Sequence, residues 1–149
     1  MSTALHLCGP DDLPRLAALC ARYHEETGLD LSDDHRHAAL APLLEGSPLG
    51  AAYIAGPKTA PIGYLIVSFG WSIERGGMVG TVNELWVRPS VRGRGLGSEI
   101  LLSVSKALSS VGLKALQLEV DRDDDASQRL FARARFELRD RFALMTREA

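Results

Sequence analysis

The sequence predicts a single-domain α/β protein, with a mixed β-sheet that carries helices on both faces. Two patterns favour this fold class: strand-like runs come as a pair early in the chain, and later runs alternate with helical patterns as βαβαβ. The chain has 149 residues, which is enough to bury one hydrophobic core. We therefore expect its whole length, 1–149, to form one domain.

Elements in the first half are separated by residues that begin or end helices and turns. Gly28 is expected to close the first helix, Ser32 to cap the second, and Pro42 to kink or end that second helix early. The run 56–61 contains the glycine and prolines typical of a turn between two strands. The expected elements are a strand at 4–8, a helix from about 13 to 28, a helix at 32–45, and strands at 50–55 and 62–69.

Elements in the second half are centred on a glycine-rich stretch at 92–97. A loop that contains Trp71 is expected to lead into the strand before this stretch, and Gly112 to end the helix after it. An acidic run at 121–125 can cap a further helix. The expected elements are strands at 81–87 and 115–120, helices from about 98 to 112 and at 126–134, and one or two closing strands at 136–138 and 142–145.

Composition excludes several classes of protein. Hydrophobic residues make up 46% of the chain and charged residues 24%, and the net charge of -2 argues against a nucleic-acid partner. No apolar run approaches the roughly 20 residues that cross a membrane, so no membrane partner is expected. Cys8 and Cys20 form no C-x-x-C motif, and the four histidines form no H-x-x-x-H pair. We therefore expect a cytoplasmic protein without a metal site.

The glycine-rich stretch, Arg92-Gly93-Arg94-Gly95-Leu96-Gly97, opens a helix just after a strand-like run. Glycine lets a ligand approach the backbone closely. The first N–H groups of a helix have no partners within the helix, and the helix dipole makes this end attractive to anions. The two arginine side chains could add further contacts. The stretch therefore predicts a loop that binds phosphate groups.

Spacing separates three kinds of phosphate-binding loop. A Walker loop is excluded because no Gly-Lys-Ser/Thr is present. A dinucleotide-binding loop is disfavoured because Ser98 replaces its third glycine, although Glu119 lies near the distance expected for a ribose-binding acid. The third pattern, R/Q-x-x-G-x-G/A, is matched by Arg92, Gly95 and Gly97.

Together with Leu85-Trp86-Val87-Arg88-Pro89 before it, this loop resembles the signature of the GNAT superfamily, the acyl-CoA-dependent N-acyltransferases. The resemblance covers nearly the whole chain in element order and is motif-specific over about residues 82–136. It implies a mostly antiparallel sheet with a splayed central strand pair, and acetyl-CoA as cosubstrate. By this resemblance, the residues that bind acetyl-CoA would be Leu85, Trp86 and Val87 at the pantetheine, and Arg92, Gly93, Arg94, Gly95, Leu96 and Gly97 at the pyrophosphate.

The family also has a later pattern like N-x-x-A-x-x-L-Y-x-x-x-G-F, which residues 124–136 match in part. Leu130 and Phe136 agree with this pattern. Asp124 stands in place of the asparagine near the pantetheine, and Phe131 in place of the tyrosine that protonates the departing thiolate. The resemblance thus implies that both residues lie at the acetyl-CoA site, and that the usual acid is missing there.

Glu84 is the candidate catalytic base. On a strand with a period of two it shares a face with Val82 and Trp86. In the family that the chain resembles, a carboxylate near this point often deprotonates the acceptor ammonium, which has a pKa of about 10 and no lone pair for attack. Glu84 could instead be a solvated strand residue or the partner of an arginine, and Glu74 is the next candidate base.

The sequence therefore predicts an N-acetyltransferase that moves an acetyl group from acetyl-CoA to a primary amine by direct attack, with a backbone N–H of the splayed strand facing the oxyanion. A rival interpretation, motivated by Phe131, is an acyl-CoA-binding module without turnover. A nucleotide-binding domain that uses Glu119 is a more distant third.

The acceptor amine is not identified by the sequence, and a small molecule and a peptide both fit. Acidic residues gather between Glu25 and Asp34, and residues 1–80 carry 5 Lys/Arg against 9 Asp/Glu. This charge favours cationic amines as acceptors. A homodimer is left open.

Overall fold

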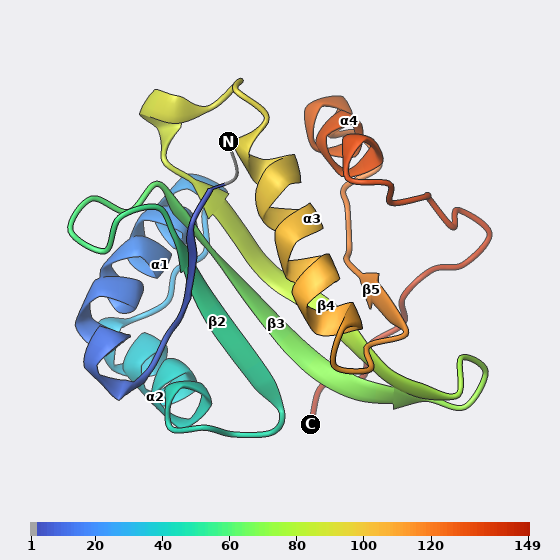
Figure 1. Ribbon diagram of the computed structural model, residues 1–149, viewed down its shortest axis with the longest axis horizontal. Coiled ribbons are helices and arrows are strands. Elements are labelled where there is room, and N and C mark those ends of the chain that lie inside the picture. The colour runs from blue at the N-terminus through green and yellow to red at the C-terminus, as the bar shows by residue number, and fades with distance from the viewer. Residues whose placement is uncertain (1–2) are drawn as a thin grey trace.

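The computed structural model describes residues 3–149 (Figure 1). Glycines and capping residues set most of the boundaries: Gly28 ends the first helix in a left-handed conformation, and the Ser32 side chain caps the second. The elements are β1 (Leu5–Leu7), η1 (Pro10–Asp12), α1 (Leu13–Thr27), α2 (Asp33–Leu44), β2 (Gly50–Ala55), β3 (Gly63–Ser72), β4 (Gly77–Val87), η2 (Pro89–Val91), α3 (Leu96–Ser109), β5 (Ala115–Gln117) and α4 (Asp125–Arg133).

The strands form one sheet in the order β1-β2-β3-β4-β5. Neighbouring strands are antiparallel from β1 to β4, whereas β5 runs parallel to β4. The predicted fold class, a mixed and mostly antiparallel sheet, is therefore confirmed. A dinucleotide-binding fold has a mostly parallel sheet, whereas here β4 and β5 are the one parallel pair among the described strands and every other pair is antiparallel.

β4 and β5 separate after a short region of pairing. Only Val79–Thr81 pairs with β5, and residues 118–120 of the predicted strand at 115–120 leave the sheet. From residue 82 to 87, the edge of β4 that faces away from β3 pairs with no strand among the described residues. This separation is the splayed central pair that the resemblance implies, and it opens a cleft in the sheet.

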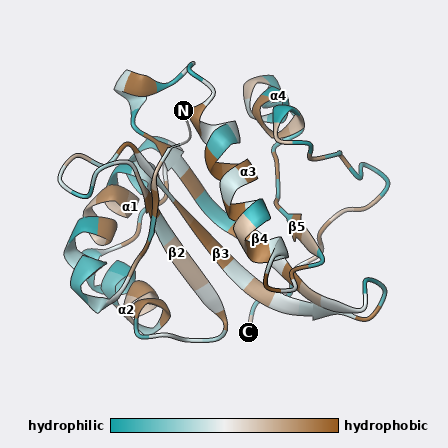
Figure 2. Cartoon of the chain, viewed as in Figure 1, coloured by the Kyte–Doolittle hydropathy of each residue, from teal (hydrophilic) through white to brown (hydrophobic). Residues whose placement is uncertain are grey.

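Helices cover both faces of the sheet and build two cores. α1 and α2 pack on one face around Tyr64 and Trp86, and α3 packs on the other around Leu65 and Val67. Hydrophilic and hydrophobic residues alternate around α1 and α3, as expected for helices with one apolar side (Figure 2). None of the helices among residues 3–149 is long and apolar enough to cross a membrane.

Two sequence-based expectations for loops and strands are wrong. The loop expected to contain Trp71 is instead the end of a long hairpin, because Gly76 adopts φ 75° and closes a turn directly between Ser72 and Gly77. The closing strands expected at 136–138 and 142–145 do not form. These residues have the composition of strands, but a strand also needs a partner, and they pair with none of the strands among residues 3–149.

Candidate active site

A β-bulge in β4 decides which way its side chains point. Ile66 of β3 pairs with Glu84, but the following residue, Val67, pairs with Val82. Asn83 is therefore an extra residue in β4. Side chains of a strand alternate between two faces, so the extra residue reverses the alternation from this point onward.

The reversal places Glu84 toward the face covered by α1 and α2. Trp86 belongs to the core on that face, as the sequence predicts for a neighbour of Glu84. Val82, the other expected neighbour, packs in the core on the opposite face together with Leu85. The expectation about Val82 is wrong because it assumed an unbroken period of two.

Glu84 lies in a chain of hydrogen-bonded side chains. One carboxylate oxygen accepts a bond of 2.7 Å from the Tyr64 hydroxyl, and the other is 2.6 Å from Nε2 of His24. Nδ1 of His24 lies 3.2 Å from a guanidinium nitrogen of Arg36, which can only donate. Nδ1 must then accept, so Nε2 carries the hydrogen and donates it to Glu84. Asp33 in turn binds Arg36 at 2.7 Å.

This chain orients the Glu84 carboxylate, because both partners donate hydrogen bonds to it. Burial, followed by the nearby Cys20 and Glu84, raises the pKa of Tyr64 well above its usual range, so the hydroxyl remains a donor. His24 is 5% exposed, whereas the Glu84 side chain is 20% exposed. A ligand can therefore reach the carboxylate but hardly the imidazole behind it.

Glu84 opens into a cavity of about 210 Å³ between α1, α2 and the sheet. Its walls are mostly apolar, and the polar residues that line it are His24, His35, Arg36, Asn83 and Glu84. The apolar residues that line it are Cys20, Leu31, Ala39, Leu40, Leu43 and Ile66. The cavity fits a small molecule whose polar end meets Glu84.

The two cysteines are not suited to nucleophilic chemistry. Burial raises the pKa of Cys8 and of Cys20 to about 12, so both remain neutral thiols near neutral pH. Cys20 does line the smaller cavity, but the nearby Glu84 charge also disfavours its thiolate. A covalent cysteine intermediate is therefore not supported.

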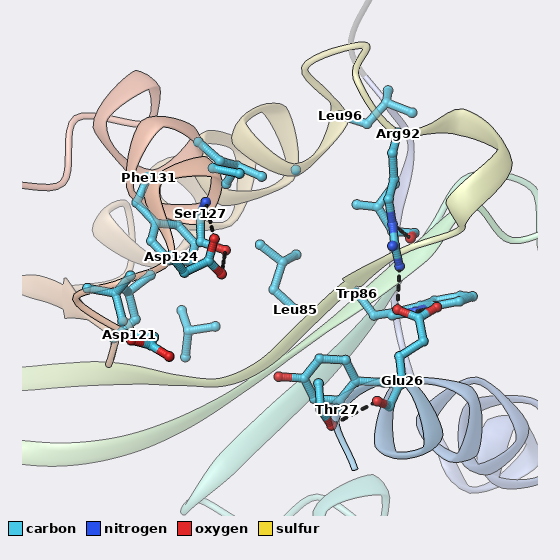
Figure 3. A pocket seen from close by; sticks show the side chains of 18 of the residues that line it. Glu26, Thr27, Leu85, Trp86, Arg92, Leu96, Asp121, Asp124, Ser127 and Phe131 are labelled. Atoms are coloured by element: carbon cyan, nitrogen blue, oxygen red, sulfur yellow. Dashed lines mark hydrogen bonds and ion pairs between the residues drawn. The ribbon is translucent and has the colours of Figure 1, made fainter. Parts of the chain in front are cut away.

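A second cavity, of about 550 Å³, lies in the cleft between the open edge of β4 and α4 (Figure 3). Leu85 projects into its middle, with Asp124 and Phe131 on the α4 side and Arg92 on the other. Asn83 lines both cavities, so the two meet at the β-bulge. The residues predicted to bind acetyl-CoA that line this larger cavity are Leu85, Trp86, Val87, Arg92, Gly93, Gly95, Leu96, Gly97, Asp124 and Phe131.

The glycine-rich loop presents a row of backbone donors to this cavity. Gly93 and Gly95 have φ of 80° and 76°, values that favour glycine. The first backbone bond of α3 runs from the Glu99 N–H to the Gly95 oxygen. The six amides from Gly93 to Ser98 make no hydrogen bond to any residue among 3–149. Such an arrangement is typical of a phosphate-binding helix terminus.

The side chains of the loop do not all act as the sequence suggests. The Arg92 guanidinium donates to the Val87 oxygen at 2.8 Å and to Glu26 at 2.7 Å, so it ties the loop to α1 instead of facing an anion. Arg94 is exposed and is the one predicted acetyl-CoA residue that does not line the cavity. A Cβ on Gly97 would lie 2.8 Å from Leu130, so this glycine permits α3 to pack on α4.

The backbone N–H and C=O groups of β4 point to β3 at one residue and to the cleft at the next. The Arg88 N–H binds the Ile62 oxygen, so the N–H and C=O of Arg88 face β3, and by alternation those of Trp86 do too. The N–H and C=O of Leu85 and Val87 therefore face the cleft, which agrees with the bond from Arg92 to the Val87 oxygen. Of the three strand residues predicted at the pantetheine, Trp86 therefore presents no backbone N–H or C=O to the cleft.

At α4, Asp124 and Phe131 have structural partners of their own. Asp124 is the N-cap of α4 and accepts from the Ser127 N–H at 3.0 Å and the Ser127 hydroxyl at 2.6 Å. The ring of Phe131 packs against Phe136, with 6.2 Å between ring centroids. Both residues line the larger cavity, but the Phe131 ring brings no proton to it.

Sequence reasoning missed the partners of Glu84 and a second tyrosine. Tyr23 of α1 lines the larger cavity, and burial, followed by the Glu84 charge, raises its pKa so that it stays protonated. Its ring meets Tyr64 edge-on at 6.4 Å. One signal was available: His24 continues, at intervals of four, the buried stripe of α1 that holds Leu16 and Cys20. A histidine at such a position needs a buried partner.

The model of the acetyltransferase (GNAT) family matches residues 13–136. The chain belongs to this family. The residues matched run from the start of α1 to the end of the α4 motif and so include both cavities. The predicted family membership is thereby confirmed, and acetyl transfer is the general activity that it supports.

Solved structures agree with this membership. An integron cassette protein from the mobile metagenome of Cole Harbour Salt Marsh is 32% identical, with 97% of this chain and 90% of that chain covered and a TM-score of 0.85. Two further structures are similar in fold. A ribosomal-protein-alanine N-acetyltransferase from Brucella melitensis is 18% identical, with 99% and 100% covered and a TM-score of 0.77. An aminoglycoside acetyltransferase from an uncultured soil metagenomic sample, in complex with sisomicin, is 12% identical, with 99% and 96% covered and a TM-score of 0.81. No protein of curated function matches the sequence significantly.

Proposed function

We propose that this GNAT protein transfers an acetyl group from acetyl-CoA to a small primary amine by direct attack. The observation that carries the proposal is the meeting of two cavities at Asn83. The larger cavity contains unpartnered backbone amides that suit an acyl-CoA, and the smaller contains an accessible carboxylate that suits an amine. The acceptor and the chemical roles below are parts of this proposal.

On the donor side, the amides from Gly93 to Ser98 hold the pyrophosphate of acetyl-CoA, which supplies the activated acetyl thioester. The open space beside Gly95, where a Cβ would meet no atom within 4 Å, leaves room for that approach. The backbone N–H and C=O of Leu85 and the backbone N–H of Val87, which face the cleft, bind the pantetheine arm and the thioester oxygen. A backbone N–H at this point stabilises the negative charge that develops on the oxygen during attack.

On the acceptor side, the ammonium group of the substrate lies against Glu84 in the smaller cavity. Glu84 takes one proton, and the free amine nitrogen attacks the thioester carbon. The volume of about 210 Å³ is below the roughly 300–1,000 Å³ of pockets for drug-sized ligands, so the acceptor is a small amine or a single side chain of a peptide. Exposed Glu25, Asp30 and Asp34 favour acceptors with an additional positive charge.

Departure of the CoA thiolate needs a proton, and Tyr23 is the group that we assign to this step. The new carbon–nitrogen bond replaces the carbon–sulfur bond, and the sulfur takes the proton from the Tyr23 hydroxyl. The attacking nitrogen then loses its extra proton, which restores the Tyr23 hydroxyl. The raised pKa of Tyr23 keeps that proton available near neutral pH. The tyrosine on α1 thereby replaces the one that Phe131 displaces on α4.

A second candidate is an acyl-CoA-binding module without turnover, which Phe131 favours because it puts an apolar ring where the family pattern has an acid. Consumption of acetyl-CoA and release of thiol, measured with a panel of amino acids, polyamines, aminoglycosides and short peptides, decides between the two. Thiol release that depends on an amine supports the acetyltransferase. Tight binding of acetyl-CoA without release to any amine supports the module.

A further inference from the structure

Glu84, the proposed base, has no arginine or lysine as a direct partner. Among residues 3–149, the ion pair that includes its carboxylate is the one with His24. The nearest cation along its chain of hydrogen bonds is Arg36, and the His24 imidazole separates the two. A neutral imidazole in this place leaves the charge of the carboxylate to a ligand, whereas an imidazolium would take it up.

Arg36 is held in α2 with one of its nitrogens against His24. Its side chain is 11% exposed, and Asp33 accepts from Nη2 at 2.7 Å. This bond, followed by the charge of Arg36, lowers the pKa of Asp33. Nη1 lies 3.2 Å from Nδ1 of His24. A guanidinium only donates and keeps its protons in proteins, so the contact requires a free lone pair on Nδ1.

The imidazole would be open to a second proton if Arg36 were absent. Nε2 is 2.6 Å from Glu84, and a carboxylate this close favours an imidazolium. The neighbouring hydroxyls of Tyr23 and Tyr64 stay protonated, chiefly because burial raises their pKa. Arg36 opposes the second proton, because an N–H on Nδ1 would face an N–H of the guanidinium.

We propose that Arg36 is a positioning residue that acts on Glu84 through His24. It keeps the imidazole singly protonated, so Glu84 receives a neutral hydrogen bond and its charge remains for the ammonium group of the acceptor. An imidazolium would compete with that ammonium and make the carboxylate a weaker base. Because both ring nitrogens are engaged, His24 has no lone pair with which to accept the proton from Glu84, so it does not relay that proton.

The effect on catalysis rests on the proposed function, but the state of the His24 ring can be measured without it. Nitrogen-15 NMR of the full chain near neutral pH shows which ring nitrogens carry hydrogen, and the signals lost in His24→Gln assign this residue among the four histidines. We expect hydrogen on Nε2 alone in the parent and on both nitrogens in Arg36→Met. His37→Ala is the control, because exposed His37 also lies in the first turn of α2 but contacts the Asp33 backbone oxygen instead of His24.

Thiol release that depends on an amine measures the effect on the base. Arg36→Met should lower kcat/KM for the amine by roughly tenfold or more and leave acetyl-CoA affinity little changed. The loss should shrink as the pH is raised, because the ring then gives up its second proton. In a His24→Gln background Arg36→Met should have little further effect, since a glutamine can donate to Glu84 but cannot become a cation. His37→Ala should behave like the parent.

The ring state in the parent can overturn the proposal even if a variant does not fold. Hydrogen on Nδ1, alone or together with Nε2, would contradict it, as would a ring that stays singly protonated in folded Arg36→Met. A loss of rate that is the same at every pH and in the His24→Gln background would mean that Arg36 only supports α2. A parent that acetylates no amine but shows the expected ring states in both proteins contradicts the proposed function and supports the hold of Arg36 on His24. Thermal unfolding of each variant separates these effects from a lost fold.

Discussion

Glu84 accepts hydrogen bonds from both of its buried partners, so a change that keeps its shape tests its role as a base. Glu84→Gln should lower the rate near neutral pH by roughly 10²–10⁴-fold and leave acetyl-CoA affinity unchanged. The loss should shrink as the pH rises toward the pKa of the acceptor, because more of the amine is then free without a base. Turnover across this pH range and calorimetric titration measure the two effects.

Glu74→Gln is the matched control, because Glu74 lies in the exposed turn of the β3–β4 hairpin. This variant should behave like the parent at every pH. A normal rate for Glu84→Gln together with a reduced rate for Glu74→Gln would move the base to the hairpin.

Tyr23 is the proposed donor of the proton to the thiolate, and the two aromatic residues around the cavity can be tested together. Tyr23→Phe should lower turnover by about tenfold or more, with acetyl-CoA affinity little changed. Adding Phe131→Tyr to this variant should restore part of the rate, because it returns a hydroxyl to the opposite wall of the cavity. Steady-state thiol release checks both steps. Equal rates for the parent and Tyr23→Phe would assign the proton to water or to the ammonium product.

At the scale of single residues, the sequence identifies groups that belong to a local motif and misses those that depend on distant contacts. The glycine-rich loop and Glu84 lie within one short stretch, and their positions follow from it. His24 is 60 residues from Glu84, and nothing in the spacing of either predicts their contact of 2.6 Å. Arg92 was expected near an anion, but its partner Glu26 comes from another element.

The two glycines of the loop that precede and begin α3 should differ in what they affect. Gly95→Ala forces a side chain into a left-handed conformation at a cost of roughly 1–2 kcal/mol and adds a methyl group to the donor cavity. We expect weaker binding of acetyl-CoA. Gly97→Ala places its Cβ against Leu130 and should lower the melting temperature by separating α4 from α3. Calorimetric titration and thermal unfolding of both variants test the distinction. Unchanged titration for Gly95→Ala would place the anion elsewhere.

At the scale of elements, helices were easier to predict than strands. Ser32, Gly28 and similar residues mark helix ends through local bonds, and the helices lie close to their expected bounds. A strand needs a partner, and so its sequence alone does not establish it. Residues 142–145 are apolar enough for a strand and yet pair with no strand among residues 3–149. The bulge at Asn83 is equally hidden, since it is defined by the register with β3.

For the whole molecule, charge should influence which amine arrives. Glu26 and Asp33 are bound by arginines, whereas Glu25, Asp30 and Asp34 remain exposed. Exposed charges are screened by salt, since the Debye length falls from about 30 Å at 0.01 M to about 8 Å at 0.15 M. For a diamine and a monoamine of equal length, we expect the diamine to have the higher kcat/KM at low salt and to lose more of it as salt is added. A monoamine preference at low salt would contradict this expectation.

The extra residue in β4 sets the face of the sheet to which every later side chain of the strand points. Asn83→Ala changes one side chain and should be tolerated. Deletion of Asn83 would instead shift every later residue of the strand by one position, sending the Glu84 carboxylate toward the apolar core of the α3 face and Leu85 toward α1. A point substitution could not repair such a shift, but a compensating insertion next to the deleted position could. Insertions and deletions are therefore expected to be far more damaging here than in the hairpin turn a few residues earlier.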